Sequence, residues 1–440
     1  MGEEGFEGLE RSLTEAFCEA QREVTAEALA GLDEDVPCLY IGGQRYRRAV
    51  RSKGRYLTAA GAVEVERTLY RSARSARSVA VLDVRAGVVA ELWTPLAARQ
   101  GAALVAHVTP QEAEGLLAEL GHMRPSKSSL DRLPKVLGGA WEAEREGLEA
   151  RLRAQTQVPE QAVSMAVSLD GVMVPMKEDQ GAGQSAEGGA HAPGKKSVYR
   201  EASCATLSFF DAEGKRLSSV RMARMPEAKK ATLKAMLAAE VHEALGQRPE
   251  LTVVKLADGA KDNWTYLDSV LPAGESVLDF YHAAEQLSEA FDAAYGQGSA
   301  KAGEYITKYR HILRHEPDGA KRVIRALRYQ HQRHPRSERI AQVLQYFRNN
   351  RHRMRYHEMK ARNLPIGSGV VEAACKTLVT QRLKRSGMRW RIPGGQAILT
   401  LRSWAQSGRF ENGWEILAEA REQTVELPEN VVPLRARRGR

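Results

Sequence analysis

Residues 162–170 read AVSMAVSLD, an apolar run that ends in a carboxylate, and residues 251–259 read LTVVKLADG, a second run of the same kind. Both runs have the length and the β-branched content of buried strands. Two further strands are expected at 199–210 and 216–223, and the DAEG turn between them makes them an antiparallel hairpin. Helical and strand patterns then alternate up to a helix that begins at Tyr281. These residues predict an α/β domain.

Three antiparallel strands followed by alternating helices and parallel strands is the order of an RNase H-like catalytic core with a mixed five-stranded sheet. The fifth strand is expected at 276–279. An all-helical insertion, 286–365, then interrupts the core. It is strongly basic, with 17 Lys and Arg against 5 Asp and Glu in residues 301–362. After a Gly-Ser-Gly break, a last core helix is expected at about 370–385.

The residues upstream of the core predict a mostly helical DNA-binding region. Residues 6–32 have the spacing of an amphipathic helix with an acidic, solvated outer face, and 55–70 read as a β-hairpin. Three short helices are expected at 97–107, 111–120 and 128–137. The last two suit a helix-turn-helix, because the second opens with hydroxyls and cations, although most helical hairpins bind nothing.

The predicted organisation therefore has six parts. They are an acidic helical leader (1–45), a DNA-binding region with the β-hairpin and the helix-turn-helix-like helices (46–160), the first part of the RNase H-like core (161–285), the basic helical insertion (286–365), the second part of the core with the Glu372 helix (366–408) and a C-terminal tail (409–440). Two segments are expected to be unstructured: the small, polar loop 180–194 and the Arg-rich end 433–440.

The charge of the 440-residue chain is unevenly distributed. Residues 1–40 hold 11 acidic and 2 basic side chains, whereas the rest of the chain holds 44 acidic and 63 basic ones. Such a basic body favours a polyanionic partner, and nucleic acid is the first expectation. No apolar run reaches the ~18–20 residues that cross a bilayer, and the N-terminus lacks a signal-peptide pattern. We therefore expect a cytoplasmic protein with no membrane partner. The four cysteines, which predict neither a disulfide framework nor a zinc site, are Cys18, Cys38, Cys204 and Cys375.

Three carboxylates occupy the places where an RNase H-like core carries its metal ligands. Asp170 follows the apolar run 163–169 of a first strand that continues to Pro175, Asp258 ends the fourth strand and precedes Gly259, and Glu372 lies in the first turn of the last helix. Nucleases cleave phosphodiesters with two Mg²⁺ ions, and Mg²⁺ prefers oxygen ligands. Each acid alone also fits a turn, cap or helix-dipole role. Their joint order on the expected elements predicts a site for two Mg²⁺ ions, with Mn²⁺ as an alternative metal.

Five sequence blocks downstream of Asp170 form a distinctive set. They are DGA at 258–260, LDFYH at 278–282, GSGVVEAACK at 367–376, QRLKRSGMRW at 381–390 and AILTLRS at 397–403. This set resembles bacterial insertion-sequence transposases of the ISKra type, which are relatives of the Mutator-like DDE transposases. The resemblance covers at least residues 160–405. It implies that Asp170, Asp258 and Glu372 form the metal-binding triad and that the basic helices are the family's insertion in the catalytic fold. Such proteins often carry paired cysteines near the N-terminal hairpin, and residues 70–75 have none.

Other residues are expected to position the phosphate or to bind DNA. The resemblance places His282 near the active site, where it would orient the scissile phosphate or a metal-bound water; a packed, hydrogen-bonded histidine is the alternative. No acid occurs between Lys376 and Arg391, which favours phosphate contacts for the cations there. Trp390 fits base stacking or, more often, core packing. The residues expected to contact DNA are Lys127, Arg132, Arg351, Arg353, Arg355, Lys376, Arg382, Lys384, Arg385 and Arg389.

Together these features predict a transposase that binds the terminal inverted repeats of an insertion sequence and catalyses metal-dependent DNA cleavage and strand transfer. The expected partners are double-stranded DNA, both repeat and target, and further copies of the chain. Two DNA ends must be joined, so a homodimer or higher oligomer on DNA is expected. Two alternatives stay open: an RNase H-like nuclease without strand transfer, and a domesticated, non-catalytic DNA-binding descendant.

Overall fold

The computed structural model of the chain describes residues 5–74, 77–177 and 198–428. The chain divides into two compact units: a terminal unit, Met1–Leu152 with Gln396–Arg440, and a central unit, Arg153–Gly395. The segments 180–194 and 433–440, both expected to be unstructured, lie outside the described residues. Among the residues that are described, no helix is both long and apolar enough to cross a membrane.

The terminal unit contains a five-stranded antiparallel sheet in the order β10-β1-β2-β3-β4. The hairpin expected at 55–70 is confirmed, and its first strand is longer than predicted. The remaining three strands have two to four residues each, too few for a sequence pattern, and were not predicted. The strands are β1 (Cys38–Ile41), β2 (Gln44–Thr58), β3 (Gly61–Arg71), β4 (Ser78–Ala80) and β10 (Val425–Glu426).

Helices complete the terminal unit, and the three short helices expected there are present as α3, α4 and α5. The Thr109 side chain accepts a hydrogen bond from the Glu112 backbone, and the Glu112 carboxylate accepts one from the Thr109 backbone, so α4 begins with a capping box. Trp141 and Trp404 pack edge to face, 4.6 Å apart, between α5 and α16. The helices are α1 (Gly5–Gly31), α2 (Val81–Arg85), α3 (Pro95–His107), α4 (Pro110–Leu120), α5 (Lys127–Ala143), α6 (Arg145–Ala154), α16 (Ile392–Gln406) and α17 (Phe410–Ala420).

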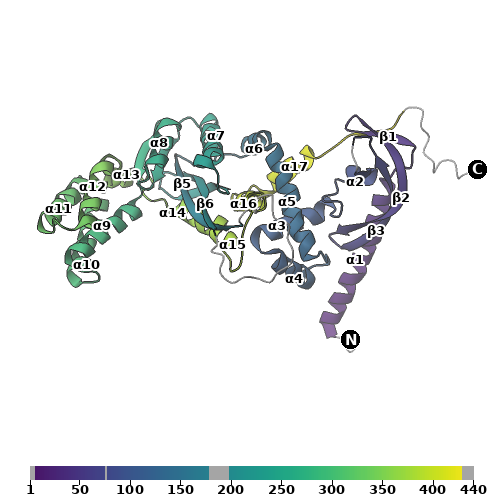
Figure 1. Cartoon of the computed structure of the whole chain (residues 1–440), viewed down its shortest axis with the longest axis horizontal. Coiled ribbons are helices and arrows are strands. Elements are labelled where there is room, and N and C mark those ends of the chain that lie inside the picture. The colour runs from purple at the N-terminus through teal and green to yellow at the C-terminus, as the bar shows by residue number, and fades with distance from the viewer. Residues whose placement is uncertain (1–4, 75–76, 178–197, 429–440) are drawn as a thin grey trace, which may run out of the picture. The chain divides into compact units, whose positions relative to one another are not determined.

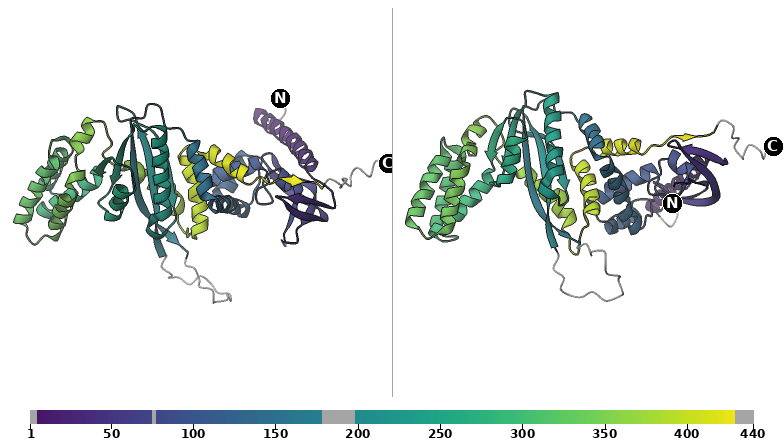
Figure 2. Two further views of the ribbon diagram at one scale, coloured as in Figure 1. Left: turned by 90° about the horizontal axis from the view of Figure 1, so that it is seen from above. Right: turned by 45° about the horizontal axis from the view of Figure 1, so that its top comes forward.

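The central unit is built on a mixed five-stranded sheet in the order β7-β6-β5-β8-β9 (Figure 1). β5 and β6 pair over their whole length as a long antiparallel ribbon (Figure 2), and β7 pairs antiparallel with β6. β8 runs parallel to β5, and β9 runs parallel to β8. Each parallel connection contains a helix, as such crossovers require. The elements are β5 (Ser164–Met176), β6 (Val198–Phe210), β7 (Arg216–Arg224), α7 (Ala231–Gln247), β8 (Thr252–Ala257), α8 (Lys261–Ser269) and β9 (Glu275–Leu278).

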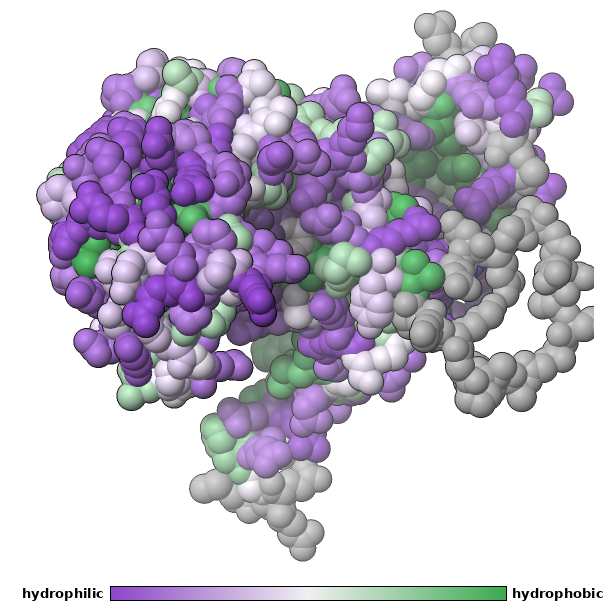
Figure 3. Space-filling view, turned by 60° about the vertical axis from the view of Figure 1, so that its left-hand side comes forward, coloured by the Kyte–Doolittle hydropathy of each residue, from purple (hydrophilic) through white to green (hydrophobic). Residues whose placement is uncertain are grey.

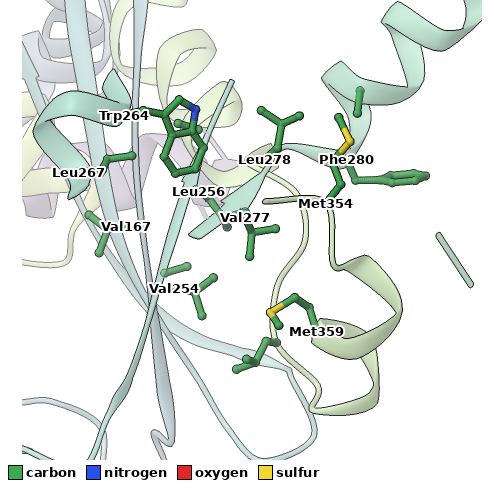
Figure 4. Packing of buried hydrophobic residues seen from close by; sticks show 14 of the residues in the cluster. Val167, Val254, Leu256, Trp264, Leu267, Val277, Leu278, Phe280, Met354 and Met359 are labelled. Carbon is green, nitrogen blue, oxygen red and sulfur yellow. The ribbon is translucent and has the colours of Figure 1, made fainter. Parts of the chain in front are cut away.

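A set of helices follows β9 and gathers at one end of the central unit (Figure 1). Their inner faces join the core of the sheet. Met354 and Met359 belong to the same buried cluster as Val254, Val277 and Phe280 (Figure 4). The insertion is therefore continuous with the core in its packing. Its elements are α9 (Phe280–Tyr295), α10 (Ala300–His315), α11 (Gly319–Arg333), α12 (Glu338–Asn350), a 3₁₀ turn (Arg351–Arg353) and α13 (Tyr356–Ala361).

The last helix of the central unit has three parts, where the sequence predicted a single helix at about 370–385. α14 (Gly369–Ala374) passes into a π-helix (Cys375–Thr380) and then into α15 (Gln381–Leu383). A π-helical turn contains an extra residue and is often found at functional sites. Here it begins at Cys375, the position where this helix contacts β5 through Asp170.

The compact units divide the chain differently from the predicted parts. The central unit ends at Gly395, so most of α16 belongs to the terminal unit, whereas the sequence assigned 366–408 to the catalytic core. The segment taken as a C-terminal tail contains α17 and β10, which are elements of the terminal unit. Leu417 of α17 is buried in that unit's core with Trp404.

Candidate active site

Asp170 and Asp258 come from two neighbouring parallel strands. The register of β5 and β8 ends at the pair Ser168–Leu256. Asp170 is two residues further along β5, and Asp258 is two residues further along the chain, directly after the end of β8 at Ala257. Both side chains are partly exposed. The register therefore brings both acids to the region at the carboxyl end of β8.

The turn that carries Asp258 is fixed by its own hydrogen bonds. Asp258 Oδ1 accepts from the Ala260 backbone at 3.1 Å and from Asn263 Nδ2 at 3.3 Å. The Asp258 carbonyl accepts from Trp264 Nε1 at 2.6 Å. A Cβ at Gly259 would overlap the ring of Tyr346 on α12, so only glycine allows this close approach. Burial, followed by the nearby Asp258 and Asp279 charges, raises the pKa of Tyr346 above its usual range.

The third predicted acid is on α14, which contacts the same strand as Asp170. Glu372 is exposed, and its Oε1 accepts a hydrogen bond from Ser368 Oγ at 3.0 Å. Cys375, one turn further, donates from its thiol to Asp170 Oδ2 at 3.6 Å. The helix of the third acid is thus tied to the strand of the first.

A fourth acid, Asp279, links the two sides of this region, and the sequence analysis did not assign it to the site. Its side chain is fully buried. Oδ1 accepts from the backbones of Tyr281 at 2.6 Å and His282 at 2.9 Å, which caps α9, while Oδ2 accepts from the Ser368 backbone. The sequence position of Asp279 could have indicated this role, because Asp279 directly follows β9 as Asp258 directly follows β8.

His282 lies in the first turn of α9 and is half-buried. Its Nδ1 is 3.6 Å from Glu285 Oε2, one turn further along the helix. Its backbone N–H donates to Asp279, so the position of the ring depends on the α9 cap. The structure thereby connects His282 to Asp279 and, through Ser368, to the Glu372 helix.

The three predicted ligands match Mg²⁺ in chemistry. Carboxylate oxygens are the hard ligands that Mg²⁺ prefers, and the three acids come from β5, the end of β8 and α14. Among the described residues, no group of three or more His, Cys, Asp or Glu side chains stands close enough to hold a metal ion. The three acids therefore agree with a Mg²⁺ site in ligand type and in the elements that carry them. In the described residues their side chains are not close enough together to surround one ion.

The cations near Glu372 are not equivalent. Lys376, Lys384 and Arg389 are exposed, and Arg385 is half-buried, with Nε donating to the Gln381 carbonyl at 3.0 Å. Arg382 is only 1% exposed. Its guanidinium lies 5.5 Å from the centroid of the Trp390 ring, so the expectation that it contacts DNA phosphates is corrected: it is an interior residue.

Trp390 is held by the protein itself. Its Nε1 donates to the Leu383 carbonyl at 2.9 Å, and its backbone pairs with Pro175 and Lys177 beside β5. These contacts favour the packing role over base stacking.

The arginines expected to contact DNA from the insertion have partners in the central unit. Arg353 lies 3.9 Å from the Trp264 ring centroid and 2.8 Å from Asp268. Arg355 pairs with Glu275 on β9 and with Glu358 at 3.3 Å. Arg353 thereby links the 3₁₀ turn to α8, and Arg355 links the start of α13 to β9. Because both guanidiniums already have acidic partners, the expectation of free phosphate contacts is corrected. Arg351 is exposed.

The two cations predicted in the helix-turn-helix-like region lie at the start of α5. Ser126 caps this helix by accepting from the Ser129 backbone at 3.2 Å. Lys127 is exposed, and its Nζ donates to Gln111 Oε1 of α4 at 3.0 Å. Arg132 is exposed on the following turn.

No protein-family model and no curated protein sequence matches this chain. Among solved structures, it is similar to one described as a Drosophila P element transposase strand transfer complex, with 10% sequence identity and a TM-score of 0.29. That similarity covers 72% of this chain and 80% of the other.

Proposed function

We propose that this chain is a DDE-type transposase that cuts the ends of its own mobile element and joins them to target DNA. The order of the central sheet, β7-β6-β5-β8-β9, supports an RNase H-like core. Strands β7, β6 and β5 are antiparallel, and β8 and β9 follow on the other side of β5 and run parallel to it. The helices from α9 to α13 would be the insertion in this core. The sequence motifs at 258–260, 278–282 and 367–376 resemble the ISKra type.

One observation carries the proposal: the parallel register of β5 and β8. It supports a shared site, because Asp170 and Asp258 each come two residues after the last pair of this register although 88 positions separate them in the sequence. The contact between Cys375 and Asp170 adds the Glu372 helix to the same region. An isolated acid beside a strand has many structural uses, whereas three acids in this order on these elements favour a shared catalytic role.

Asp170, Asp258 and Glu372 would hold two Mg²⁺ ions, or Mn²⁺ in their place, which when bound activate the attacking oxygen and stabilise the leaving oxygen. The protein's own residues have the task of fixing the carboxylates. The Asp258 turn is fixed by Ala260 and Asn263, and Glu372 is oriented by Ser368. His282, at the start of α9, would orient the scissile phosphate.

Double-stranded DNA is the proposed substrate, first as the terminal inverted repeats of the element and then as the target. The exposed cations Lys376, Lys384 and Arg389 would contact phosphates beside the acids, and Lys127 and Arg132 would contact the repeats. Joining two ends implies at least two copies of the chain on DNA.

The test is a strand-transfer reaction with the full chain. A labelled duplex carrying the inverted repeats that flank its gene is incubated with Mg²⁺ and a supercoiled plasmid. We expect the labelled strand to become covalently joined to the plasmid. Cleavage without joined product would support the RNase H-like nuclease instead, and DNA binding without either reaction would support a non-catalytic descendant.

Matched variants separate chemistry from binding. Asp170→Asn, Asp258→Asn and Glu372→Gln each keep the shape of the side chain but remove its charge, so each should abolish cleavage while leaving DNA affinity within about twofold. Glu304→Gln, an exposed acid of α10, is the control and should retain cleavage. Activity of Glu372→Gln within about tenfold of the parent would falsify the triad assignment.

A further inference from the structure

Helix α11 carries cations and no acid along its whole length, Gly319–Arg333. Its inner side is apolar and buried in the core of the central unit. Positions three, four and seven residues apart share a helix face. The outer side therefore presents one continuous surface, which we call the α11 outer face and which consists of the exposed residues Arg325, Arg328, Tyr329 and Gln332.

The cations of α11 differ in whether an acid neutralises them. Lys321 Nζ lies 2.6 Å from Asp318, and Arg322 pairs with Glu316, both acids of the preceding turn. Within the described ranges, no acidic side chain lies within ion-pairing distance of Arg325 or Arg328. The α11 outer face thus holds two adjacent guanidiniums whose charge is not compensated.

The remaining members of the face also suit a polar, anionic partner. Tyr329 is 53% exposed, and its hydroxyl accepts from Arg333 Nη1 at 3.3 Å. The Arg333 guanidinium lies 5.8 Å from the centroid of the Tyr329 ring. Figure 3 brings the α10–α12 end of the central unit forward and shows a largely hydrophilic surface with scattered hydrophobic residues. A phosphate backbone offers many acceptors and needs no apolar pocket, so the chemistry of the face matches it.

We infer that the α11 outer face binds the sugar–phosphate backbone of duplex DNA, independently of base sequence. The inference rests on the proposed function and names the part of the insertion that contacts DNA. The α11 outer face takes the place of Arg353 and Arg355 as the proposed DNA contact of the insertion. The guanidiniums of those two residues already contact Trp264, Asp268 and Glu275. Arginine suits this role because its planar group donates two parallel hydrogen bonds to a phosphate.

The experiment compares two double variants of the full chain on the same helix. Arg325→Gln/Arg328→Gln removes the uncompensated charges, and Lys321→Gln/Arg322→Gln removes the same number of paired ones. Affinity for a 30-bp duplex of arbitrary sequence is measured by fluorescence anisotropy at several NaCl concentrations. EDTA is present, so that no metal-dependent reaction contributes. Circular dichroism verifies that both variants keep the parent's helix content and melting temperature.

We expect the Arg325/Arg328 variant to reduce the slope of log affinity against log salt by about 1.8, since each lost phosphate contact contributes about 0.9. The Lys321/Arg322 variant should change the slope by less than about half a unit. An unchanged slope for the Arg325/Arg328 variant, or equal changes for both variants, overturns the inference and leaves the proposed function standing.

Two other outcomes are also decisive. A parent protein that binds no duplex DNA overturns the proposed function together with the inference. If sedimentation shows that Arg325→Gln/Arg328→Gln lowers the oligomeric mass while the salt slope is unchanged, the face is a protein–protein interface and the DNA assignment is wrong.

Discussion

The thiol of Cys375 donates a hydrogen bond to Asp170 Oδ2, and 205 positions separate the two residues in the chain. Asp170 is also the direct partner of Cys204 in the pairing of β5 with β6. A hydrogen bond with Cys204, burial and the nearby Asp170 charge, in that order of size, raise the pKa of the Cys375 thiol above its usual range. Two thiols that are distant in sequence therefore flank one candidate metal ligand.

We expect Cys375 to resist alkylation in the folded protein. The thiolate is the reactive form, and Cys375 is both 5% exposed and held as a thiol, whereas Cys38 is partly exposed. With iodoacetamide at pH 8, Cys38 should react at least about tenfold faster than Cys375. Peptide mass spectrometry measures both rates, and the difference should vanish in urea. Equal alkylation rates of Cys38 and Cys375 in the native chain would show that the Cys375 thiol is accessible to the reagent.

Replacing Asp279 by Asn should loosen the link between α9 and the segment before α14. The buried Asp279 carboxylate accepts three backbone hydrogen bonds, and the amide can accept them only with its single oxygen. We expect a loss of about 1–3 kcal/mol in local stability. Hydrogen–deuterium exchange of peptides 280–284 and 366–372 measures it.

Ser368→Ala is the matched control for Asp279→Asn. It removes the hydroxyl that donates to Glu372 but keeps the backbone N–H that donates to Asp279. Its effect on exchange should stay below about 1 kcal/mol. If the two variants lost the same protection, the backbone contact with Asp279 would not be the stabilising element.

Arg353→Ala should lower stability without changing the salt dependence of DNA binding. The Arg353 guanidinium covers the Trp264 ring and pairs with Asp268, whose side chain is 44% exposed. Most of the expected loss, about 1–2 kcal/mol, comes from the ring contact, because solvent weakens the ion pair. The melting temperature should fall for Arg353→Ala and stay constant for the exposed Arg351→Ala. If Arg353→Ala reduced the slope of log DNA affinity against log salt, Arg353 would be a DNA contact after all.

The terminal unit should lose stability at high pH through Tyr70. Burial raises the pKa of Tyr70 to about 12, from an ordinary value of 10.0. Because the folded state holds this proton more tightly, the stabilisation is complete below pH 10 and is lost as the pH rises toward 12. The free energy of unfolding should therefore fall across that window, by up to about 1.4 kcal/mol per pH unit for this residue.

Tyr70→Phe provides the comparison. The variant loses the hydroxyl that donates to the Glu34 carbonyl at 2.8 Å and accepts from the Val36 backbone at 3.0 Å. It should be less stable near neutral pH and show a shallower decline between pH 10 and 12 in urea titrations. Identical slopes for the two proteins would rule out Tyr70 as the titrating group.

The central sheet could be predicted because its strands are apolar runs separated by clear turns. The predicted strands at 162–170 and 251–257 correspond to β5 and β8, and the predicted hairpin 199–223 corresponds to β6 and β7. In the terminal unit, the pattern of 55–70 revealed one hairpin, but β1, β4 and β10 are two to four residues long. Strands of that length have too few positions for an alternating pattern, and β10 pairs with β1 from the far end of the chain.

Side-chain roles were harder to predict than strands, because they depend on residues far apart in the sequence. Arg382 has no acid nearby in the chain, which suggested a phosphate contact, yet it is buried beneath Trp390. Arg353 was expected to contact DNA, and its partners Trp264 and Asp268 lie about 85 positions earlier. Asp279 has a recognisable position after a strand, but only the fold shows its contact with Ser368.

The chain leaves the core after β9 and returns to it at nearly the same point, where the Phe280 backbone donates to the Ile366 carbonyl at 2.9 Å. Closing a flexible loop of this length costs about 2 kcal/mol more than closing a ten-residue loop. Helices α9 to α13 would remove most of that freedom if they form before the ends meet, since helices depend on local contacts. We therefore expect the insertion to fold early. The folded insertion would hold the two chain ends close together, so that the Glu372 helix docks on the sheet in the last step of folding.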